Sequence, residues 1–143
     1  MTISQLLDFI ARHPVMVGWF VCSALALGLF ELWRLRRQPG TVSPQQLTAM
    51  LNRDNAVLID LRDVAQFREG HIAGAHHVGP EHLIKHLGDK KPQGPVILCC
   101  HDGVLSAKMA TEAGQALGQR VLVLRHGLNG WRGEGLPLVV GRH

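Results

Sequence analysis

The sequence predicts an α/β fold, with a parallel sheet flanked by helices and preceded by one N-terminal transmembrane helix. Short apolar segments of strand length alternate with segments of helical character after residue 41, a pattern typical of parallel strands buried on both faces. Near the N-terminus, sixteen consecutive residues carry no charge. We divide the chain into a short N-terminal segment (1–14), a transmembrane helix (15–33), a basic linker (34–41) and the α/β domain (42–143).

The uncharged segment runs from Val15 to Phe30, and its extension to Trp33 gives 19 residues. A helix needs ~20 residues to cross about 30 Å of hydrocarbon. Three arginines follow the segment, at positions 34, 36 and 37, whereas Arg12 alone precedes it. Because positive charge favours the cytoplasmic side, we expect an anchor in contact with membrane lipid and a domain in the cytoplasm. A cleaved signal peptide is the alternative, with Ala24-Leu25-Ala26 as its cleavage site, but the following residues stay apolar.

The composition narrows the possible functions. Residues 1–40 hold four Arg against two acidic residues, and residues 41–143 hold eleven basic against nine acidic, so each part carries +2 of the net +4. Without a basic run, the domain has no electrostatic footprint for nucleic acid. Three cysteines, two of them adjacent, cannot form a disulfide framework and fit a reducing compartment. His82 and His86 lie one helical turn apart, but no Cys or carboxylate completes a metal site, so we expect neither metal nor cofactor.

Capping residues and apolar runs define the elements of the domain. Ser43 and Pro44 are an N-cap and an N1 proline. Gly70, Gly88 and Gly118 stand where helices are expected to end. The expected helices are 44–51, 63–69, 80–87 and 106–117, and the expected strands are 56–60, 75–78, 95–99 and 121–124.

The loop after the strand 95–99 is the predicted site of chemistry. Cys100 opens this loop and Ser106 begins the next helix, so backbone N–H groups should converge on the cysteine. Such a field favours the thiolate, and we expect the pKa of Cys100 to fall below its ordinary value. Gly103 allows the loop to close without a Cβ. Ser106 is expected to act as an N-cap or to donate a hydrogen bond to the thiolate.

Three motifs resemble those of the rhodanese-like domain family, over about residues 42–139. The loop Cys100-x-x-Gly103-x-Leu105-Ser106 is similar to the family's C-x-x-G-x-R-S. The segment from Leu58-Ile59-Asp60-Leu61-Arg62 through Gly70-His71-Ile72-x-Gly74-Ala75 resembles a specific family signature, and Leu124-x-x-Gly127-x-x-x-Trp131 resembles a third. With its anchor, the chain resembles membrane-anchored, single-domain members from Gram-negative bacteria, which implies a single-pass protein of the inner membrane.

The resemblance implies sulfurtransferase chemistry, in which Cys100 takes sulfur from thiosulfate or a persulfide, holds it as a persulfide and passes it to a thiol. The active-site loop would comprise His101, Asp102, Gly103, Val104, Leu105 and Ser106, with Asp60 and Arg62 as supporting residues. Six residues from Cys100 through Leu105 match sulfurtransferases, whereas related phosphatases have seven.

Leu105 departs from the pattern, because the family loop usually has Arg there. An Arg would offer a charge-assisted contact to an anionic donor. The sequence therefore leaves two functions open: a membrane-anchored sulfurtransferase, or a catalytically weak interaction module that binds a partner such as a membrane protein. Cys99, His71 and Trp131 are interpreted as packing or structural residues.

Overall fold

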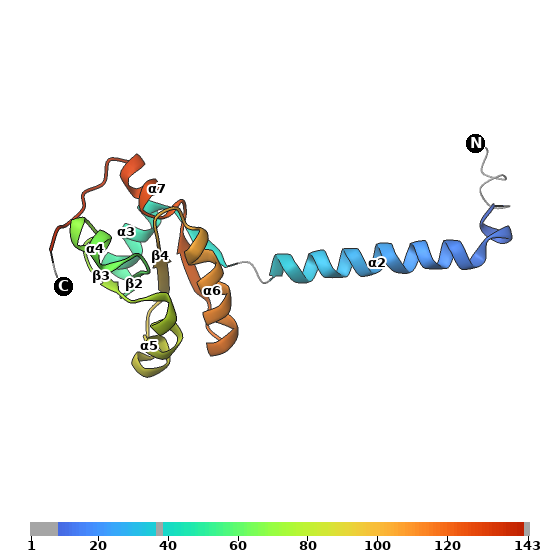
Figure 1. Ribbon diagram of the computed structural model, residues 1–143, viewed down its shortest axis with the longest axis horizontal. Helices are drawn as coiled ribbons and strands as arrows, with labels where there is room; N and C mark the ends of the chain where they lie inside the picture. The colour runs from blue at the N-terminus through green and yellow to red at the C-terminus, as the bar shows by residue number, and fades with distance from the viewer. Residues whose placement is uncertain (1–8, 37–38, 142–143) are drawn as a thin grey trace. The chain divides into compact units, whose positions relative to one another are not determined.

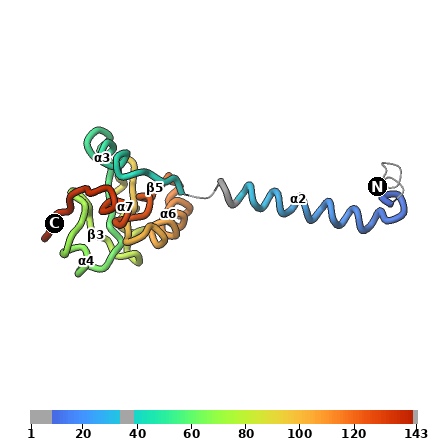
Figure 2. The backbone as a smooth tube through the Cα atoms, turned by 90° about the horizontal axis from the view of Figure 1, so that it is seen from above, coloured from blue at the N-terminus to red at the C-terminus, as the bar shows by residue number. Residues whose placement is uncertain are grey.

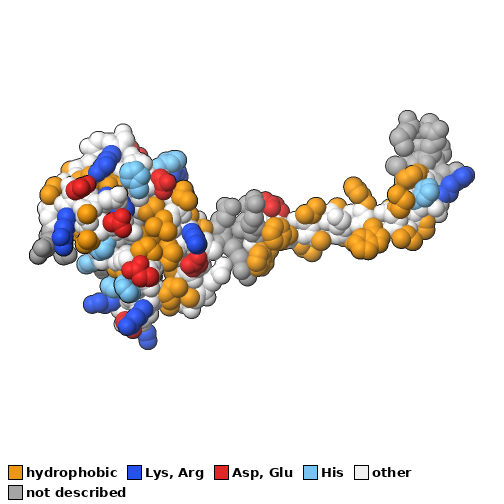
Figure 3. Space-filling model, viewed as in Figure 1, with side chains coloured by type: hydrophobic (Ala, Val, Ile, Leu, Met, Phe, Trp, Pro, Cys, Tyr) orange, Lys and Arg blue, Asp and Glu red, His pale blue; other side chains and the backbone are white. Residues whose placement is uncertain are grey.

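The computed structural model describes residues 9–36 and 39–141, and the chain divides into two compact units, residues 1–37 and 38–143. In the first unit, α2 (Pro14–Arg36) is one uninterrupted helix (Figures 1 and 2). Among the described residues, its segment Pro14–Trp33 is the one helix long and apolar enough to cross a membrane. Apolar side chains line the face of α2 visible in Figure 3. The helix continues past the predicted end at residue 33, and Arg37 lies outside the described residues.

The second unit contains a five-stranded sheet in the order β1-β5-β4-β2-β3. Every pair of neighbouring strands is parallel, which confirms the predicted sheet. The strands are β1 (Gly40–Val42), β2 (Val57–Asp60), β3 (Ala75–His77), β4 (Val96–Cys99) and β5 (Val121–Leu124). β4 is the central strand, so the loop that follows it leaves the middle of the sheet at its carboxyl edge, where α/β folds form their sites.

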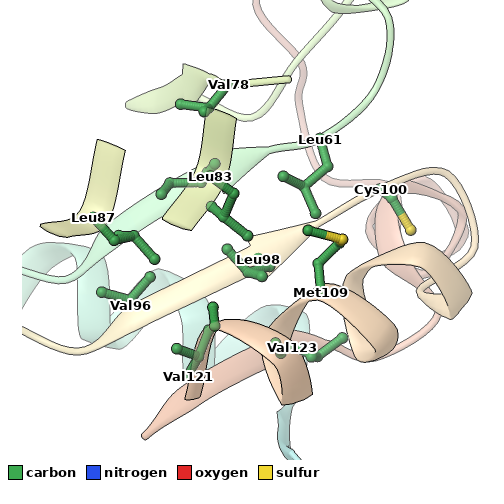
Figure 4. Packing of buried hydrophobic residues seen from close by; sticks show 13 residues of the cluster. Leu61, Val78, Leu83, Leu87, Val96, Leu98, Cys100, Met109, Val121 and Val123 are labelled. Carbon is green, nitrogen blue, oxygen red and sulfur yellow. The ribbon is translucent and has the colours of Figure 1, made fainter. Parts of the chain in front are cut away.

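Helices cover both faces of the sheet, as the apolar strands predict. They are α3 (Pro44–Arg53), α4 (Val64–Glu69), α5 (Leu83–Lys90), α6 (Val104–Leu117) and α7 (Gly127–Gly133). One core cluster joins α5 and α6 to one face through residues such as Leu87, Leu98 and Met109 (Figure 4). A second cluster joins α3, α4 and α7 to the opposite face, with Ile97 and Trp131 among its members. Alternate residues of β4 therefore enter opposite cores.

Several elements differ from the sequence prediction. β1 begins at Gly40, inside the predicted linker 34–41, and pairs with β5. The helix α7 was not predicted, because its short sequence GLNGWRG is rich in glycine. The predicted helix 80–87 is a 3-10 turn at 80–82 followed by α5, which continues through Gly88 to Lys90. Pro92 lies just beyond and cannot extend that helix, so proline rather than glycine marks its end.

The start of α6 also differs from the prediction. The helix begins at Val104 rather than Ser106, and the residue before it, Gly103, has a left-handed φ of 95°. The N–H of Ala107 bonds to the carbonyl of Gly103 at 3.0 Å, so the first helical turn already includes the end of the cysteine loop. This early start changes which backbone N–H groups face the cysteine.

A buried ion pair fixes the chain that leaves β2. Arg62 Nη2 lies 2.6 Å from Asp60 Oδ2, and Arg62 Nε bonds to both carboxylate oxygens at 3.0 Å. The same guanidinium donates to the carbonyl of Gly70 at 2.8 Å, which ties the end of β2 to the end of α4. Asp60 is fully buried and Arg62 is 7% exposed. This buried ion pair, called the clamp below, explains the Asp60-x-Arg62 spacing in the sequence.

Arg62→Met should lower the free energy of unfolding by about 3–5 kcal/mol, because it leaves the Asp60 carboxylate buried without its partner. Denaturant unfolding of the full chain in detergent, followed by circular dichroism, measures the change. Arg68→Met, on the exposed side of α4, is the matched control and should stay within about 0.5 kcal/mol of the parent. Equal stability of the two variants would contradict a structural role for the clamp.

Candidate active site

Cys100 follows the central strand and is held within a tight loop. Its Sγ accepts hydrogen bonds from the backbone N–H groups of Gly103, at 3.1 Å, and Ser106, at 3.4 Å. The residue is 3% exposed, so the sulfur lies at the floor of the loop rather than on its rim. N–H groups at the start of a helix stabilise negative charge on an atom in this position. The arrangement suits a thiolate, or an adduct that leaves charge on the outer sulfur.

The N-terminus of α7 holds this loop from behind. The N–H of Leu128 donates to the carbonyl of Cys100 at 2.8 Å, and the N–H of Asn129 donates to the carbonyl of His101 at 3.0 Å. Gly127 has a φ of 53°, and a Cβ there would collide with the carbonyl oxygen of Cys100 and lie 2.8 Å from the nitrogen of Gly103. Because α7 was not predicted, this support was missed, although the Gly127-x-x-x-Trp131 motif was its signal in the sequence.

The two adjacent cysteines enter different cores. Cys99 packs with Ile97 and Trp131, while Cys100 packs with Leu98 and Met109 (Figure 4). Burial raises the pKa of the Cys99 thiol well above its ordinary value, and the Asp60 carboxylate adds to this increase. Cys99 therefore stays protonated near neutral pH, which agrees with its interpretation as a packing residue.

Asp102 places a carboxylate next to the sulfur. Its Oδ1 accepts the N–H of Val104 at 3.0 Å, and the thiol of Cys100 points to the same oxygen at 3.7 Å. The bond from Val104 lowers the pKa of Asp102, and the nearby Cys100 and His101 lower it further. The Asp102 side chain is exposed, so an ionised carboxylate stands at the mouth of the loop.

The structure separates the remaining loop residues into a rim and a floor. Val104 is 72% exposed and Leu105 is 39% exposed, so the position of the family's usual Arg presents an apolar side chain to solvent. Ser106 is fully buried, and among the described residues no hydrogen-bond partner lies near its Oγ. The hydroxyl is therefore not the N-cap, because α6 starts two residues earlier, and it forms no hydrogen bond to the Cys100 thiol in this structure. The backbone N–H of Ser106 reaches the sulfur instead.

Asp60 and Arg62 lie outside the cysteine loop. The Asp60 carboxylate accepts from Arg62, and the Arg62 guanidinium also donates to the backbone carbonyls of Gln66 and Gly70, so the pair supports α4 rather than the loop itself. His71 stacks on Phe67 with ring centroids 3.8 Å apart and bonds through Nδ1 to the Phe67 carbonyl. Trp131 is 5% exposed. His71 and Trp131 therefore have the structural roles that the sequence suggested.

No cation site accompanies the loop in the described parts of the chain, where no three His, Cys, Asp or Glu side chains gather as metal ligands. His82 Nε2 instead lies 3.5 Å from the carboxylate of its neighbour Glu81, and both side chains are exposed.

Comparisons with known proteins agree with this geometry. The model of the rhodanese-like domain matches residues 43–134. The YibN protein of Escherichia coli (strain K12) is 30% identical over 141 residues, which are 96% of this chain and 99% of that protein. The thiosulfate sulfurtransferase GlpE of Glaesserella parasuis is 32% identical over 100 residues, covering 70% of this chain and 93% of GlpE.

Solved structures show the same fold. A thiosulfate sulfurtransferase from Pseudomonas aeruginosa superposes with a TM-score of 0.65 at 26% identity, over 73% of this chain. The match spans only 20% of that longer protein. A rhodanese-related protein from Thermoplasma volcanium gives a TM-score of 0.63 at 20% identity, over 71% of this chain and 98% of that one.

Iodoacetamide should label Cys100 at least about tenfold faster than Cys99 at pH 7.5, since two backbone N–H groups donate to the sulfur of Cys100 while burial raises the pKa of Cys99. Two variants of the full chain, Cys22→Ser/Cys99→Ala and Cys22→Ser/Cys100→Ala, isolate each thiol, and intact mass follows the labelling. The labelling of Cys99 should rise only as the pH approaches its raised pKa. If Cys99 is labelled faster than Cys100 in the folded protein, Cys99 rather than Cys100 is the reactive thiol.

Proposed function

Because the chain belongs to the rhodanese-like domain family, we propose that it is a sulfurtransferase that carries sulfur as a persulfide on Cys100. The observation that carries the proposal is the pair of N–H groups, from Gly103 and Ser106, that donate to Cys100 Sγ. The match to a relative named a thiosulfate sulfurtransferase supports the same class of reaction.

The proposed reaction has two steps on the same sulfur. The Cys100 thiolate attacks the outer sulfur of a donor such as thiosulfate, the donor's S–S bond breaks, and sulfite leaves with the bonding electron pair. A Cys100 persulfide remains, with its charge facing the N–H groups of the loop. An acceptor thiolate then attacks the outer sulfur and restores the Cys100 thiolate, so sulfur is transferred without a change in the protein.

We further propose that this chemistry occurs at the cytoplasmic surface of a bacterial inner membrane. The helix within Pro14–Trp33 is long and apolar enough to span a bilayer. Three arginines follow it in the sequence and one precedes it, a bias that favours a cytoplasmic C-terminal unit. An anchored domain would meet donors and acceptors that are themselves held at the membrane.

A specific observation favours a second function, a tethered interaction module with weak catalysis. Val104 and Leu105 give the loop an exposed apolar rim where the family pattern has an arginine at position 105. Apolar side chains beside a buried cysteine suit contact with a protein partner better than capture of a small anion. The two functions differ in whether Cys100 repeatedly takes up sulfur as a persulfide and transfers it to an acceptor.

Sulfur transfer from thiosulfate to cyanide should depend on Cys100. We expect the full chain to form thiocyanate slowly but measurably, Cys100→Ser to fall to the uncatalysed background, and Cys99→Ala to stay within about threefold of the parent. A colorimetric thiocyanate assay on folded, detergent-solubilised protein measures all three. A parent no faster than Cys100→Ser, with thiosulfate and with other sulfane donors, would contradict the enzyme and favour the interaction module.

Leu105→Arg should increase transfer from thiosulfate by about one to two orders of magnitude, because a charge-assisted contact to the donor contributes about 1.5–3 kcal/mol. Leu105→Gln, which is long and polar but uncharged, is the matched control and should change the rate little. The double variant Leu105→Arg/Cys100→Ser should be inactive. If Leu105→Arg folds normally and gains nothing, position 105 does not limit the use of an anionic donor.

A further inference from the structure

The Asp102 carboxylate is held beside the sulfur that a donor must reach. Its Oδ1 is held by the N–H of Val104 at 3.0 Å and lies 3.7 Å from Cys100 Sγ. The carboxylate is exposed, whereas Cys100 is buried, so the charge is open to solvent next to a buried sulfur. A donor close enough to react with Sγ therefore comes near this charge.

The loop offers little to balance that charge. From Cys100 to Ser106, Asp102 and His101 are the only side chains besides the cysteine that ionise, and Leu105 occupies the position of the usual arginine. Counting histidine as uncharged, residues 100–106 have a formal net charge of −1. Within this segment, a doubly charged donor is therefore repelled by the Asp102 carboxylate more strongly than a singly charged one, while the backbone N–H groups attract both.

On the basis of the proposed sulfur transfer, we infer that Asp102 sets the charge specificity of the site, so that Cys100 accepts monoanionic or neutral sulfane donors in preference to the dianion thiosulfate. Asp102 is a specificity-determining residue in this account and not the nucleophile. Two neighbouring features, the absent arginine and the Asp102 carboxylate, would each lower the rate with thiosulfate, and separate variants test them.

Methanethiosulfonate is a probe matched to thiosulfate, because both donors carry the transferred sulfur on a sulfonyl group and differ by one negative charge. In each case the Cys100 thiolate forms a bond to the outer sulfur while the donor's S–S bond breaks. Sulfite leaves from thiosulfate and methanesulfinate leaves from methanethiosulfonate, each with the electron pair of the broken bond. The charge is conserved in both reactions, and both yield the same persulfide.

The size of the effect follows from Coulomb's law. One additional charge at about 6 Å from the carboxylate, in a mostly aqueous environment with a dielectric constant of about 60, alters the rate by about fivefold. Salt screens an exposed pair of this kind, so the discrimination should shrink as ionic strength rises toward about 1 M.

The first test compares the two donors on the full chain at pH 8. Asp102→Asn removes the charge and keeps an oxygen for the Val104 N–H, so it should increase the thiosulfate-to-methanethiosulfonate rate ratio by about fivefold at low salt and by less at high salt. Asp89→Asn, on the exposed side of α5, removes the same charge elsewhere and should leave the ratio unchanged. A merely structural effect of Asp102→Asn would change both donor rates together, without dependence on salt.

The second test needs no sulfur transfer. Iodoacetate and iodoacetamide alkylate the same thiol and differ in charge, so the ratio of their rates at Cys100 reports repulsion directly, with Cys22→Ser/Cys99→Ala as the parent background. Asp102→Asn should increase the ratio of the iodoacetate rate to the iodoacetamide rate at Cys100 by about fivefold.

The outcomes separate the inference from the proposed function. An unchanged alkylation ratio, or equal changes in both donor rates, overturns the role of Asp102 while leaving sulfur transfer in place. No sulfur transfer from either donor, in the parent and in Asp102→Asn, overturns the proposed function and the donor specificity that depends on it. A changed ratio in both tests, with the Asp89→Asn control unaffected, supports the inference.

Discussion

The hydrogen bonds that the N-terminus of α7 donates to the carbonyls of Cys100 and His101 are the constraint on which the site depends. Leu128 and Asn129 donate to these two carbonyl oxygens and so fix the backbone of Cys100 and His101. The rest of the loop then folds around the sulfur. The N–H groups of Gly103 and Ser106 then point at Cys100 Sγ. Gly127 makes this contact feasible, because a side chain there would collide with the Cys100 carbonyl. The central position of β4 sets the loop in the middle of the sheet edge, above both cores.

The same backbone frame holds an unusual set of side chains. A thiosulfate site needs positive charge for the donor's sulfonate, yet Leu105 is apolar and Asp102 adds a carboxylate beside the sulfur. The backbone N–H groups still favour negative charge on Cys100 itself. Stabilisation of the persulfide and attraction of the donor are therefore separate properties of this loop. The backbone N–H groups still stabilise the persulfide, whereas the side chains of Asp102 and Leu105 weaken the attraction of a dianionic donor.

Much of the fold could be predicted, because β2, β4 and β5 are mainly apolar runs of strand length. The short β1 and the glycine-rich α7 could not, since neither has a hydrophobic period of its own and tertiary contacts hold each in place. The sequence indicated Asp60 and Arg62 only as supporting residues, and the structure shows that they form a buried ion pair. The positions of individual groups around Cys100 Sγ were harder to predict. Because Gly103 is left-handed, α6 begins two residues earlier than predicted. The backbone N–H of Ser106, rather than its hydroxyl, therefore bonds to Cys100 Sγ. The proximity of Asp102 to the sulfur also depends on that turn.

The central claim is that transferred sulfur becomes bound to Cys100. The most direct measurement is the intact mass of the full chain after brief treatment with thiosulfate or methanethiosulfonate and removal of the donor, with tandem mass spectrometry to locate the change. We expect a gain of one sulfur, about 32 Da, on Cys100, reversed by a thiol reductant and absent from Cys100→Ser. A folded protein that gains no sulfur from either donor, or that gains it on Cys99 or Cys22, would show that Cys100 does not carry transferred sulfur.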